Sequence, residues 1–314
     1  MVERRHIMVT GAGGFLGRAI VDALVARDHR VTAVARRDVP VWNSDLVENV
    51  AADLGNAQLD PVLRGVDVIV HCAARMEGDD DAQLRDTILP TRRLVDAARA
   101  MAPPPVFVLV SSLSVYGYGG LSPWDEVSEA TALETRPRRR DAYTRAKLAQ
   151  EEAVEGSGLR AWILRVGAVY GPDRLWNGHL GVAKGPILVR TARQGEIPLI
   201  HVDSAARAIA MAAERDPEPP RHILNLVDSD LPDRPTYLNA IAGHGWPKVT
   251  FPVPWQVLDR LGRFTGGPGL LRPETLRSRM MPLRYVNGRS RSVLGWTPET
   301  DHPGRIARSR GRTG

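Results

Sequence analysis

The feature that most constrains the fold is a regular alternation of short apolar runs with amphipathic stretches through residue 226. Residues 66–71 and 106–110 are apolar runs of the kind that form strands buried on both faces of a sheet. Residues 16–26 instead place apolar side chains at helical spacing. This alternation predicts an α/β fold built on a doubly wound parallel sheet with right-handed crossovers.

The same patterns place the individual elements and divide the chain into two regions. Expected strands are 6–10, 31–35, 66–71, 106–110, 161–166 and 222–226, and expected helices are 16–26, 142–155, 205–215 and 255–264. Residues 171–199, rich in glycine, and residues 228–314, rich in proline, break the alternation. We therefore expect a main domain of residues 1–170 plus 200–227. A smaller mixed lobe of residues 171–199 plus 228–314 should pack over the carboxyl edge of the sheet.

Composition excludes several classes of protein. The 314 residues are 43% hydrophobic and 25% charged, which is ordinary for a folded globular chain. The formal net charge is +6, and nearly every basic residue is arginine, since lysine occurs only at Lys147, Lys184 and Lys248. Neither aromatic interleaving nor a nucleic-acid motif accompanies the arginines of 136–140 and 305–312, so we expect solvated surface and no nucleic-acid partner.

The single cysteine, Cys72, excludes an intrachain disulfide framework and a cysteine zinc site, and we expect no metal. No apolar stretch reaches the length of about 18 residues that a membrane helix needs. Residues 1–5 lead directly into a strand pattern without the apolar core of a signal peptide. These observations favour a cytoplasmic protein with no membrane partner.

A glycine-rich turn, Thr10–Gly17, lies between the first expected strand and the first expected helix. Glycine allows a positive φ and a close approach of the backbone to a ligand, and the helix N-terminus offers free N–H groups to a pyrophosphate. The turn reads G-x-x-G-x-x-G and predicts that the main domain binds a dinucleotide. The alternative is a ligand-free turn. The predicted contacts are Gly11, Gly14, Phe15, Leu16 and Gly17.

The end of the second expected strand indicates which dinucleotide is bound. An NAD site usually has an acidic residue there for the ribose 2′-hydroxyl, but this strand ends at Ala35 and continues as Arg36-Arg37. Guanidinium groups bind phosphate in a bidentate way. We therefore predict that NADP(H) is preferred over NAD(H), with Arg36 as the main contact. The alternative is that both arginines are solvated.

Tyr143 and Lys147 stand four residues apart on one expected helix face. A nearby ammonium favours the phenolate, so we expect Lys147 to lower the pKa of Tyr143 and make it a general acid/base. Ser112 lies at the carboxyl end of a central strand, where ligands of such sheets bind, and can hold a substrate oxygen. We predict Ser112, Tyr143 and Lys147 as the catalytic residues.

The motifs together resemble the extended short-chain dehydrogenases/reductases, also called the NAD-dependent epimerase/dehydratase family. The resemblance covers nearly the whole chain, in the order of that family. The matching segments are Thr10–Gly17, Asp53-Leu54, His71–Ala74, Ser111–Gly117, Tyr143–Lys147, Arg165–Pro172, His201–Asp203 and Leu294–Pro298.

The resemblance implies a Rossmann fold and a role for each matching residue. Ser112 would orient the substrate, Tyr143 would exchange the proton, and Lys147 would bind the nicotinamide ribose. The resemblance also implies a homodimer formed through a four-helix bundle. Tyr143 would contact the cofactor as well. Further implied cofactor contacts are Asp53 and Leu54 at the adenine, Ala73 and Ala74 along the cofactor, and Val169 near the nicotinamide.

Departures from the family pattern bear on the substrate. Sugar-nucleotide enzymes usually have asparagine where this chain has Ala168, and many have arginine where it has Ile197. Both residues serve a diphosphate, which needs charge-assisted donors. Leu113-Ser114 replaces the Asp-Glu pair of the dehydratases, and Thr87 replaces an asparagine, which puts a proton relay there in doubt. The segment RVGAVYGP is similar to the hydroxysteroid-dehydrogenase and dihydroflavonol-reductase branches.

We therefore predict an NADP(H)-dependent oxidoreductase that reduces a ketone, or oxidises an alcohol, of a small molecule. A nucleotide-sugar epimerase with retained cofactor is the alternative, and a non-catalytic cofactor-binding protein is a lesser one. The predicted substrate contacts are Ser112, Ser114, Trp176, His179 and Lys184. A loop that merely covers the sheet edge is the other interpretation of the segment that carries Trp176, His179 and Lys184.

Overall fold

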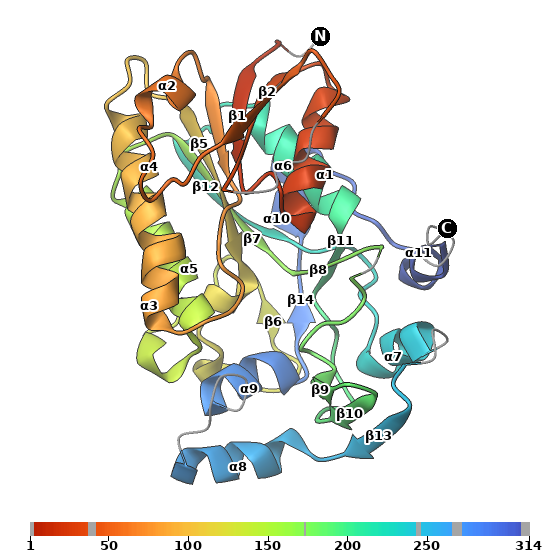
Figure 1. Cartoon of the computed structure of the whole chain (residues 1–314). Coiled ribbons are helices and arrows are strands. Elements are labelled where there is room, and N and C mark those ends of the chain that lie inside the picture. Colours follow the sequence, from red (N-terminus) through yellow and green to blue (C-terminus); the bar gives the residue numbers. More distant parts are fainter. Residues whose placement is uncertain (1–2, 37–41, 173, 243–245, 266–271, 309–314) are drawn as a thin grey trace.

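A seven-stranded parallel sheet forms the centre of the molecule in the computed structural model, which describes residues 3–36, 42–172, 174–242, 246–265 and 272–308 (Figure 1). The strand order is β12-β7-β5-β4-β1-β2-β3, so the chain moves outward from β1 in one direction and then in the other. This is the doubly wound Rossmann topology that the sequence predicted. The strands are β1 (His6–Thr10), β2 (Arg30–Ala35), β3 (Val47–Ala51), β4 (Val68–His71), β5 (Val106–Ser112), β7 (Ala161–Val166) and β12 (Arg221–Leu226).

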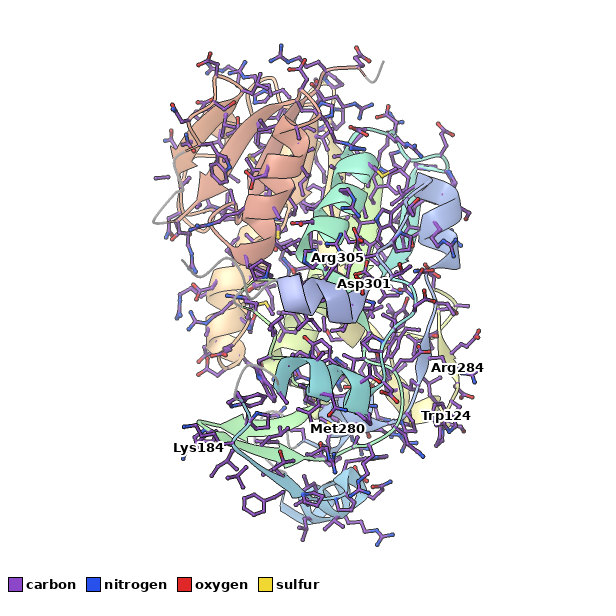
Figure 2. The ribbon with its side chains drawn as sticks, turned by 90° about the vertical axis from the view of Figure 1, so that its right-hand side faces the viewer. Trp124, Lys184, Met280, Arg284, Asp301 and Arg305 are labelled. Carbon is purple, nitrogen blue, oxygen red and sulfur yellow. The ribbon has the colours of Figure 1, made fainter. Side chains whose placement is uncertain are left out.

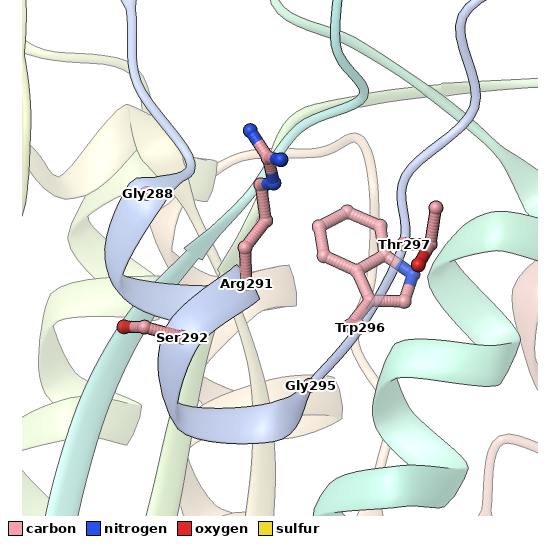
Figure 3. Close-up of a pocket in the computed structure, with 6 residues that line it drawn as sticks. All are labelled: Gly288, Arg291, Ser292, Gly295, Trp296 and Thr297. Carbon is pink, nitrogen blue, oxygen red and sulfur yellow. The ribbon is translucent and has the colours of Figure 1, made fainter.

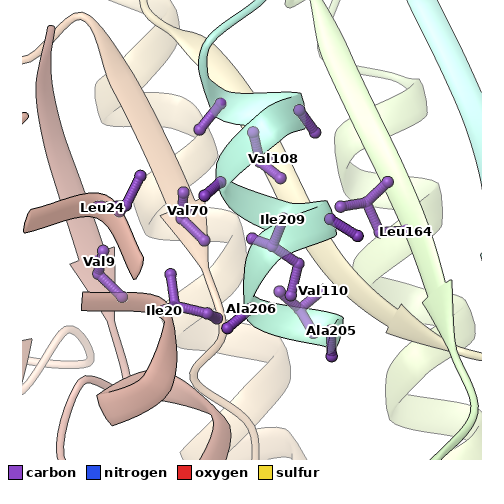
Figure 4. Packing of buried hydrophobic residues seen from close by; sticks show 14 of the residues in the cluster. Val9, Ile20, Leu24, Val70, Val108, Val110, Leu164, Ala205, Ala206 and Ile209 are labelled. Atoms are coloured by element: carbon purple, nitrogen blue, oxygen red, sulfur yellow. The ribbon is translucent and has the colours of Figure 1, made fainter. Parts of the chain in front are cut away.

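Alternate residues of each central strand supply two separate apolar cores. Val108 and Val110 of β5 pack on the face covered by α1 and α6 (Figure 4). Phe107 and Leu109 of the same strand pack on the opposite face. Both faces are buried, which explains the continuous apolar run in the sequence. The flanking helices are α1 (Phe15–Val25), α6 (Val202–Ala213) and α10 (Gly288–Leu294) on the first face, and α2 (Asp60–Leu63), α4 (Leu89–Arg99) and α5 (Ala142–Glu155) on the second.

Six of the seven strands lie where the sequence predicts them, with ends shifted by at most two residues. The seventh, β3, was not predicted. It lies at the edge of the sheet, and its five residues are exposed or only partly buried, so no buried apolar run marks it. Of the predicted helices, 142–155 has the observed bounds, while the helix expected at 205–215 begins earlier, at Val202.

The second region is built from short elements that pack below the carboxyl edge of the large sheet (Figure 1). A three-stranded mixed sheet has the order β13-β10-β9, and two small two-stranded sheets pair β11 with β8 and β14 with β6. The strands of these small sheets that lie in the predicted lobe are β9 (Gly181–Lys184), β10 (Ile187–Arg190), β13 (Val249–Pro252) and β14 (Arg284–Tyr285). Two others, β6 (Glu126–Val127) and β8 (Ala168–Tyr170), come from residues 1–170, and β11 (Leu199–His201) crosses the predicted boundary at residue 200. The helices of the second region are α7 (Arg234–Ala242), α8 (Trp255–Thr265), α9 (Pro273–Met280) and α11 (His302–Arg308).

Short helical segments complete the connections near the sheet edge. They are α3 (Asp80–Gln83), the π-helical turn η1 (Leu84–Ile88), and the 3₁₀ turns η2 (Leu113–Val115), η3 (Tyr118–Gly120) and η4 (Pro137–Arg139). Within the described ranges no helix has the length and apolarity needed to cross a membrane. The described part of the chain also holds no cluster of three or more potential metal ligands among its His, Cys, Asp and Glu residues.

Candidate active site

The glycine turn connects β1 to α1 so tightly that no side chain fits at two of its positions. Gly11 has a φ of +70°, and a Cβ there would lie 2.9 Å from the backbone N and Cα of Ala73. A Cβ at Gly17 would lie 2.1 Å from the carbonyl oxygen of Gly11. Glycine is therefore required at both positions by the packing of helix, turn and neighbouring strand.

The N-terminus of α1 offers unpaired donors at this turn. Gly14 caps the helix without a side-chain hydrogen bond, and its own N–H donates to the carbonyl oxygen of Gly11 over 2.9 Å. Among the described residues, the N–H groups of Phe15, Leu16 and Gly17 have no backbone acceptor. A helix N-terminus with free N–H groups suits a pyrophosphate, so these residues fit a dinucleotide.

Arg36, directly after β2, is one of three arginines that surround the carboxylate of Asp86. Its Nη1 lies 3.1 Å from Oδ1 of Asp86, while Arg75 and Arg85 approach the same carboxylate at 2.7 and 3.4 Å. Burial acts to raise the pKa of Asp86, but hydrogen bonds from Arg75 and Arg85 and the charge of Arg36 hold it below its usual value. Three guanidinium groups share one negative charge, which leaves an excess of positive charge beside the predicted cofactor site. Arg37 lies outside the described residues.

The other predicted cofactor contacts surround the carboxyl edge of the sheet. The Asp53 carboxylate accepts from Gly55 N at 3.0 Å within its own turn, and Leu54 is buried in the second core. Ala73 follows β4, where its N–H donates to Thr10 Oγ1 over 3.3 Å, and partly buried Ala74 comes next. Val169 lies in β8, which pairs with β11.

Ser112, Tyr143 and Lys147 come together where β5 meets α5. Ser112 is the last residue of β5, and Tyr143 is the second residue of α5. Asp141 caps α5 by accepting from Thr144 N at 2.8 Å. One turn further on, the Lys147 Nζ lies 5.8 Å from the centre of the Tyr143 ring and donates to the carbonyl oxygen of Val110 over 2.8 Å.

The protonation of this group differs from the expectation. Burial raises the pKa of Tyr143 to about 12, although a side-chain hydrogen bond with Ser112 acts to lower it. Burial also lowers the pKa of Lys147 to about 8, with Cys72 and Glu151 opposing the shift. The expectation that Lys147 lowers the pKa of Tyr143 is therefore wrong for this state of the protein. The ammonium bonds a backbone carbonyl, and the cost of burying a phenolate dominates.

A buried ion pair between Glu151 and Arg165 was not predicted from the sequence. Glu151, two turns after Tyr143 on α5, accepts from Arg165 of β7 at 3.0 and 2.7 Å and from the Ser111 hydroxyl. The three side chains are buried. They join α5 to two central strands and so hold the helix that carries Tyr143. Glu151 lies on the same helix face as Lys147 (i, i+4), and this spacing is the only signal in the sequence.

The predicted substrate residues differ in their surroundings. The Ser114 hydroxyl is buried without a hydrogen-bond partner among the described residues, and the Ser114 N–H donates to Ser112 Oγ over 3.2 Å. Trp176 packs edge-on against Trp246, with ring centres 5.2 Å apart. Lys184 is exposed at the end of β9, at the outer margin of the molecule (Figure 2).

We call Ser112 and α5 the first wall of the candidate site, and His179 with Arg279 of α9 the second wall. His179 lies against α9. Its Nδ1 lies 3.3 Å from the carbonyl oxygen of Arg279 in α9. Burial lowers its pKa to about 3, helped by the charges of Arg279 and Arg234, so the imidazole is neutral. Arg279 was not singled out in the sequence. Its Nη2 lies 3.7 Å from Oδ2 of Asp141, and its charge acts to lower the pKa of Tyr143.

Two departures from the family pattern have clear structural consequences. Ile197 is fully buried in an apolar cluster with Tyr170, so it offers no donor to a substrate. The Thr87 hydroxyl donates to Gln83 Oε1 over 3.0 Å and accepts from Arg75 N at 3.0 Å. It is therefore used as both donor and acceptor within the protein.

An open pocket of about 490 Å³ lies elsewhere, beside α10 (Figure 3). Its lining residues are Gly288, Arg291, Ser292, Gly295, Trp296 and Thr297. None of them is a predicted site residue, and Trp296 belongs to the main apolar core.

Comparison with known proteins gives consistent matches. A ceramide reductase of Caulobacter vibrioides (strain NA1000 / CB15N) is 32% identical over 216 residues, and the match covers 66% of this chain but only 61% of that protein. A dTDP-6-deoxy-L-talose 4-dehydrogenase (NAD(P)(+)) of Kitasatospora kifunensis is 28% identical over 291 residues, covering 81% and 87%. The structure of MoeE5 in complex with UDP-glucuronic acid and NAD has a TM-score of 0.74 at 23% identity, covering 96% of each chain.

Fold and glycine turn together are those of a Rossmann-type dinucleotide-binding domain. The profile of the NAD-dependent epimerase/dehydratase family matches residues 7–226. The chain belongs to this family, and its relatives include a reductase and a dehydrogenase.

Proposed function

We propose that the protein is an NADP(H)-dependent oxidoreductase that reduces the ketone of a small molecule, or oxidises the corresponding alcohol. The observation that carries this proposal is the placement of Ser112 beside a protonated Tyr143 at the carboxyl edge of the sheet. A phenol whose pKa is raised to about 12 keeps its proton at neutral pH. The proton that ketone reduction requires is therefore present on Tyr143, although a pKa nearer the working pH would make the phenol a stronger acid.

In this proposal each of the chain's own groups has one task. Ser112 holds the substrate oxygen, and the Tyr143 hydroxyl donates its proton to that oxygen. Lys147, fixed by the carbonyl of Val110, binds the nicotinamide ribose. The nicotinamide supplies the hydride when the cofactor is bound. The unpartnered Ser114 hydroxyl supports a second polar contact with the substrate.

The preference for NADP(H) is supported by the cluster around Asp86. A phosphate monoester carries about −1.5 to −2 charges at neutral pH, which the excess guanidinium charge would balance. We expect Arg36→Ala to raise the KM for NADPH by about tenfold to a hundredfold, the cost of one charge-assisted contact, with little change for NADH. Arg30→Ala is the matched control, because Arg30 begins the same strand and forms an exposed ion pair with Glu48, 3.6 Å away. Equal effects of Arg36→Ala on both cofactors would contradict the preference.

A nucleotide-sugar epimerase with retained cofactor is the second candidate, because nucleotide sugars are bound in neighbouring structures. Stoichiometry separates the two. A reductase consumes one NADPH for each ketone reduced, whereas an epimerase inverts a stereocentre without net consumption. The test is a panel of ketones and nucleotide sugars, followed by NADPH absorbance and by product stereochemistry. Turnover of nucleotide sugars alone would replace the first proposal.

A homodimer and a cytoplasmic location also remain proposals. The partly exposed Leu84 of η1 and Leu89 of α4 support an apolar contact between copies on the face that carries α4. Sedimentation of the full chain at several concentrations tests this, and a monomer at all of them would contradict it.

A further inference from the structure

Arg279 stands in the second wall of the candidate site with a charged group that the proposed proton transfer does not use. It is the penultimate residue of α9, and its neighbour Met280 is buried in the second region (Figure 2). The helix is attached to the N-terminus of α5, because Asp141 N donates to Thr275 Oγ1 over 3.2 Å. Arg279 is therefore held beside the turn of α5 that carries Tyr143.

The backbone of Arg279 is held in place by a second arginine. Buried Arg234 donates to the carbonyl oxygens of Arg279 over 2.6 Å and of His179 over 3.0 Å. It also bonds the carbonyls of Gln194 and Gly195. Three separate segments thus meet at the Arg234 guanidinium, which fixes the point from which the Arg279 side chain projects.

The Arg279 guanidinium itself has few partners. A Cβ on Gly178 would lie 2.4 Å from its Nη1, so the group lies directly against a backbone without side-chain bulk. Its ion pair with Asp141 spans 3.7 Å, and no hydrogen bond from its five N–H groups is present within the described ranges. The side chain is 29% exposed, so it remains open to a ligand.

The surrounding charges favour a singly charged anion. Asp141 already offsets part of the positive charge, and neutral His179 adds none. Arg140 is also near, but it is buried and bonded to the Tyr116 carbonyl and to Glu134. A diphosphate would need further donors, which buried Ile197 does not supply. A carboxylate matches a single guanidinium in a bidentate way.

We propose that Arg279 is a substrate-binding residue and that the substrate is an oxo acid, or the corresponding hydroxy acid, whose carboxylate pairs with Arg279. This inference rests on the proposed reductase function and specifies its substrate class. The carboxylate would lie against Gly178 while the ketone oxygen faces Tyr143 and Ser112. The pairing thus orients the ketone.

The test measures NADPH oxidation with 2-, 3- and 4-oxooctanoate, each beside its neutral amide. UDP- and dTDP-sugars are assayed in parallel for a changed stereocentre, because a sugar without a keto group cannot oxidise NADPH. The proteins are wild type, Arg279→Gln, Arg279→Lys and the control Arg277→Gln, in the same helix, whose side chain bonds the Leu121 carbonyl at 3.2 Å. We expect at least one oxo acid to exceed its amide about tenfold in kcat/KM. Arg279→Gln should lower the acid value by about tenfold to a hundredfold and leave the amide value within about threefold. Lysine should restore part of the loss, and Arg277→Gln should change neither.

A binding measurement keeps the inference separate from catalysis. Calorimetry on the NADPH-loaded protein compares octanoate with octanamide, and Arg279→Gln should weaken octanoate alone by about tenfold or more. Arg279-dependent binding of octanoate without any ketone reduction would contradict the proposed reductase function but support the anion site. Ketone reduction without an effect specific to acids would support the reductase function but contradict the anion site. Equal losses for acid and amide, no Arg279-dependent binding of octanoate, or turnover of nucleotide sugars alone would overturn the inference.

Discussion

The two walls of the candidate site are built in opposite ways. In the first wall, Tyr143, Lys147 and Glu151 come from a single helix, and Ser112 from the strand beside it. In the second wall, His179 and Arg279 are brought together across 100 residues of sequence. The first wall carries groups suited to proton transfer, and the second carries groups suited to selecting a substrate. Under the two proposals above, the reaction and its substrate are set by separate parts of the chain.

The largest expected effect is on the first wall. Tyr143→Phe removes the proton donor and should lower kcat by about 10²- to 10⁴-fold for every substrate, because general acid catalysis contributes that much. NADPH binding, followed by fluorescence, should change little. Tyr237→Phe is the control, since the Tyr237 hydroxyl donates to the Leu175 carbonyl, over 2.5 Å, in the second region. Unimpaired turnover by Tyr143→Phe would favour a non-catalytic protein.

Stability of the first wall should depend on its buried ion pair. Glu151→Ala leaves the buried Arg165 guanidinium without its carboxylate and should lower the free energy of unfolding by about 3–5 kcal/mol. Glu48→Ala removes an exposed ion pair with Arg30 and should cost no more than about 1 kcal/mol. Urea unfolding measures both. Similar midpoints for Glu151→Ala and wild type would show that this pair does not hold α5 in place.

The second wall should respond more mildly but more selectively. Arg234→Met keeps an apolar stem and removes the donors to four carbonyl oxygens, which should cost about 1–3 kcal/mol in the free energy of unfolding. Because Arg279 is then less firmly placed, we expect a higher KM for an oxo acid with little change in kcat. A loss of kcat equal to that of Tyr143→Phe would remove the distinction between the walls.

The smallest effect is a pH dependence that belongs to the first wall. Burial lowers the pKa of Lys147 to about 8, so its ammonium is present below that pH and is lost above it. Tyr143, with a pKa of about 12, stays protonated over the same range. If the ammonium is needed, kcat/KM should be level below about pH 8 and fall about tenfold for each pH unit above it. Lys147→Arg keeps a charge at high pH, so any residual activity should lose this fall, and a fall that persists would assign it to another group.

Local patterns in the sequence were sufficient for the large sheet and the first wall. Buried strands such as β5 and β7 are recognisable in the sequence as apolar runs, because both faces of each strand are covered. The edge strand β3 lacks that signal and was missed. The Y-x-x-x-K spacing placed Tyr143 and Lys147 on one face because helix geometry does so in any context. It gave no information on burial, and burial is what raised the pKa of Tyr143.

The sequence by itself determined the alternation of strands and helices, the glycine turn and the two partners on α5, since each depends on residues within a few positions of one another. The tertiary structure alone decided that Asp86 gathers Arg36, Arg75 and Arg85, and that Arg234 holds His179 and Arg279 in one wall. Charges act through space, over distances that sequence separation does not encode. The pKa of a side chain likewise depends on the tertiary structure, because burial, nearby charges and hydrogen bonds set the energy of its charged form.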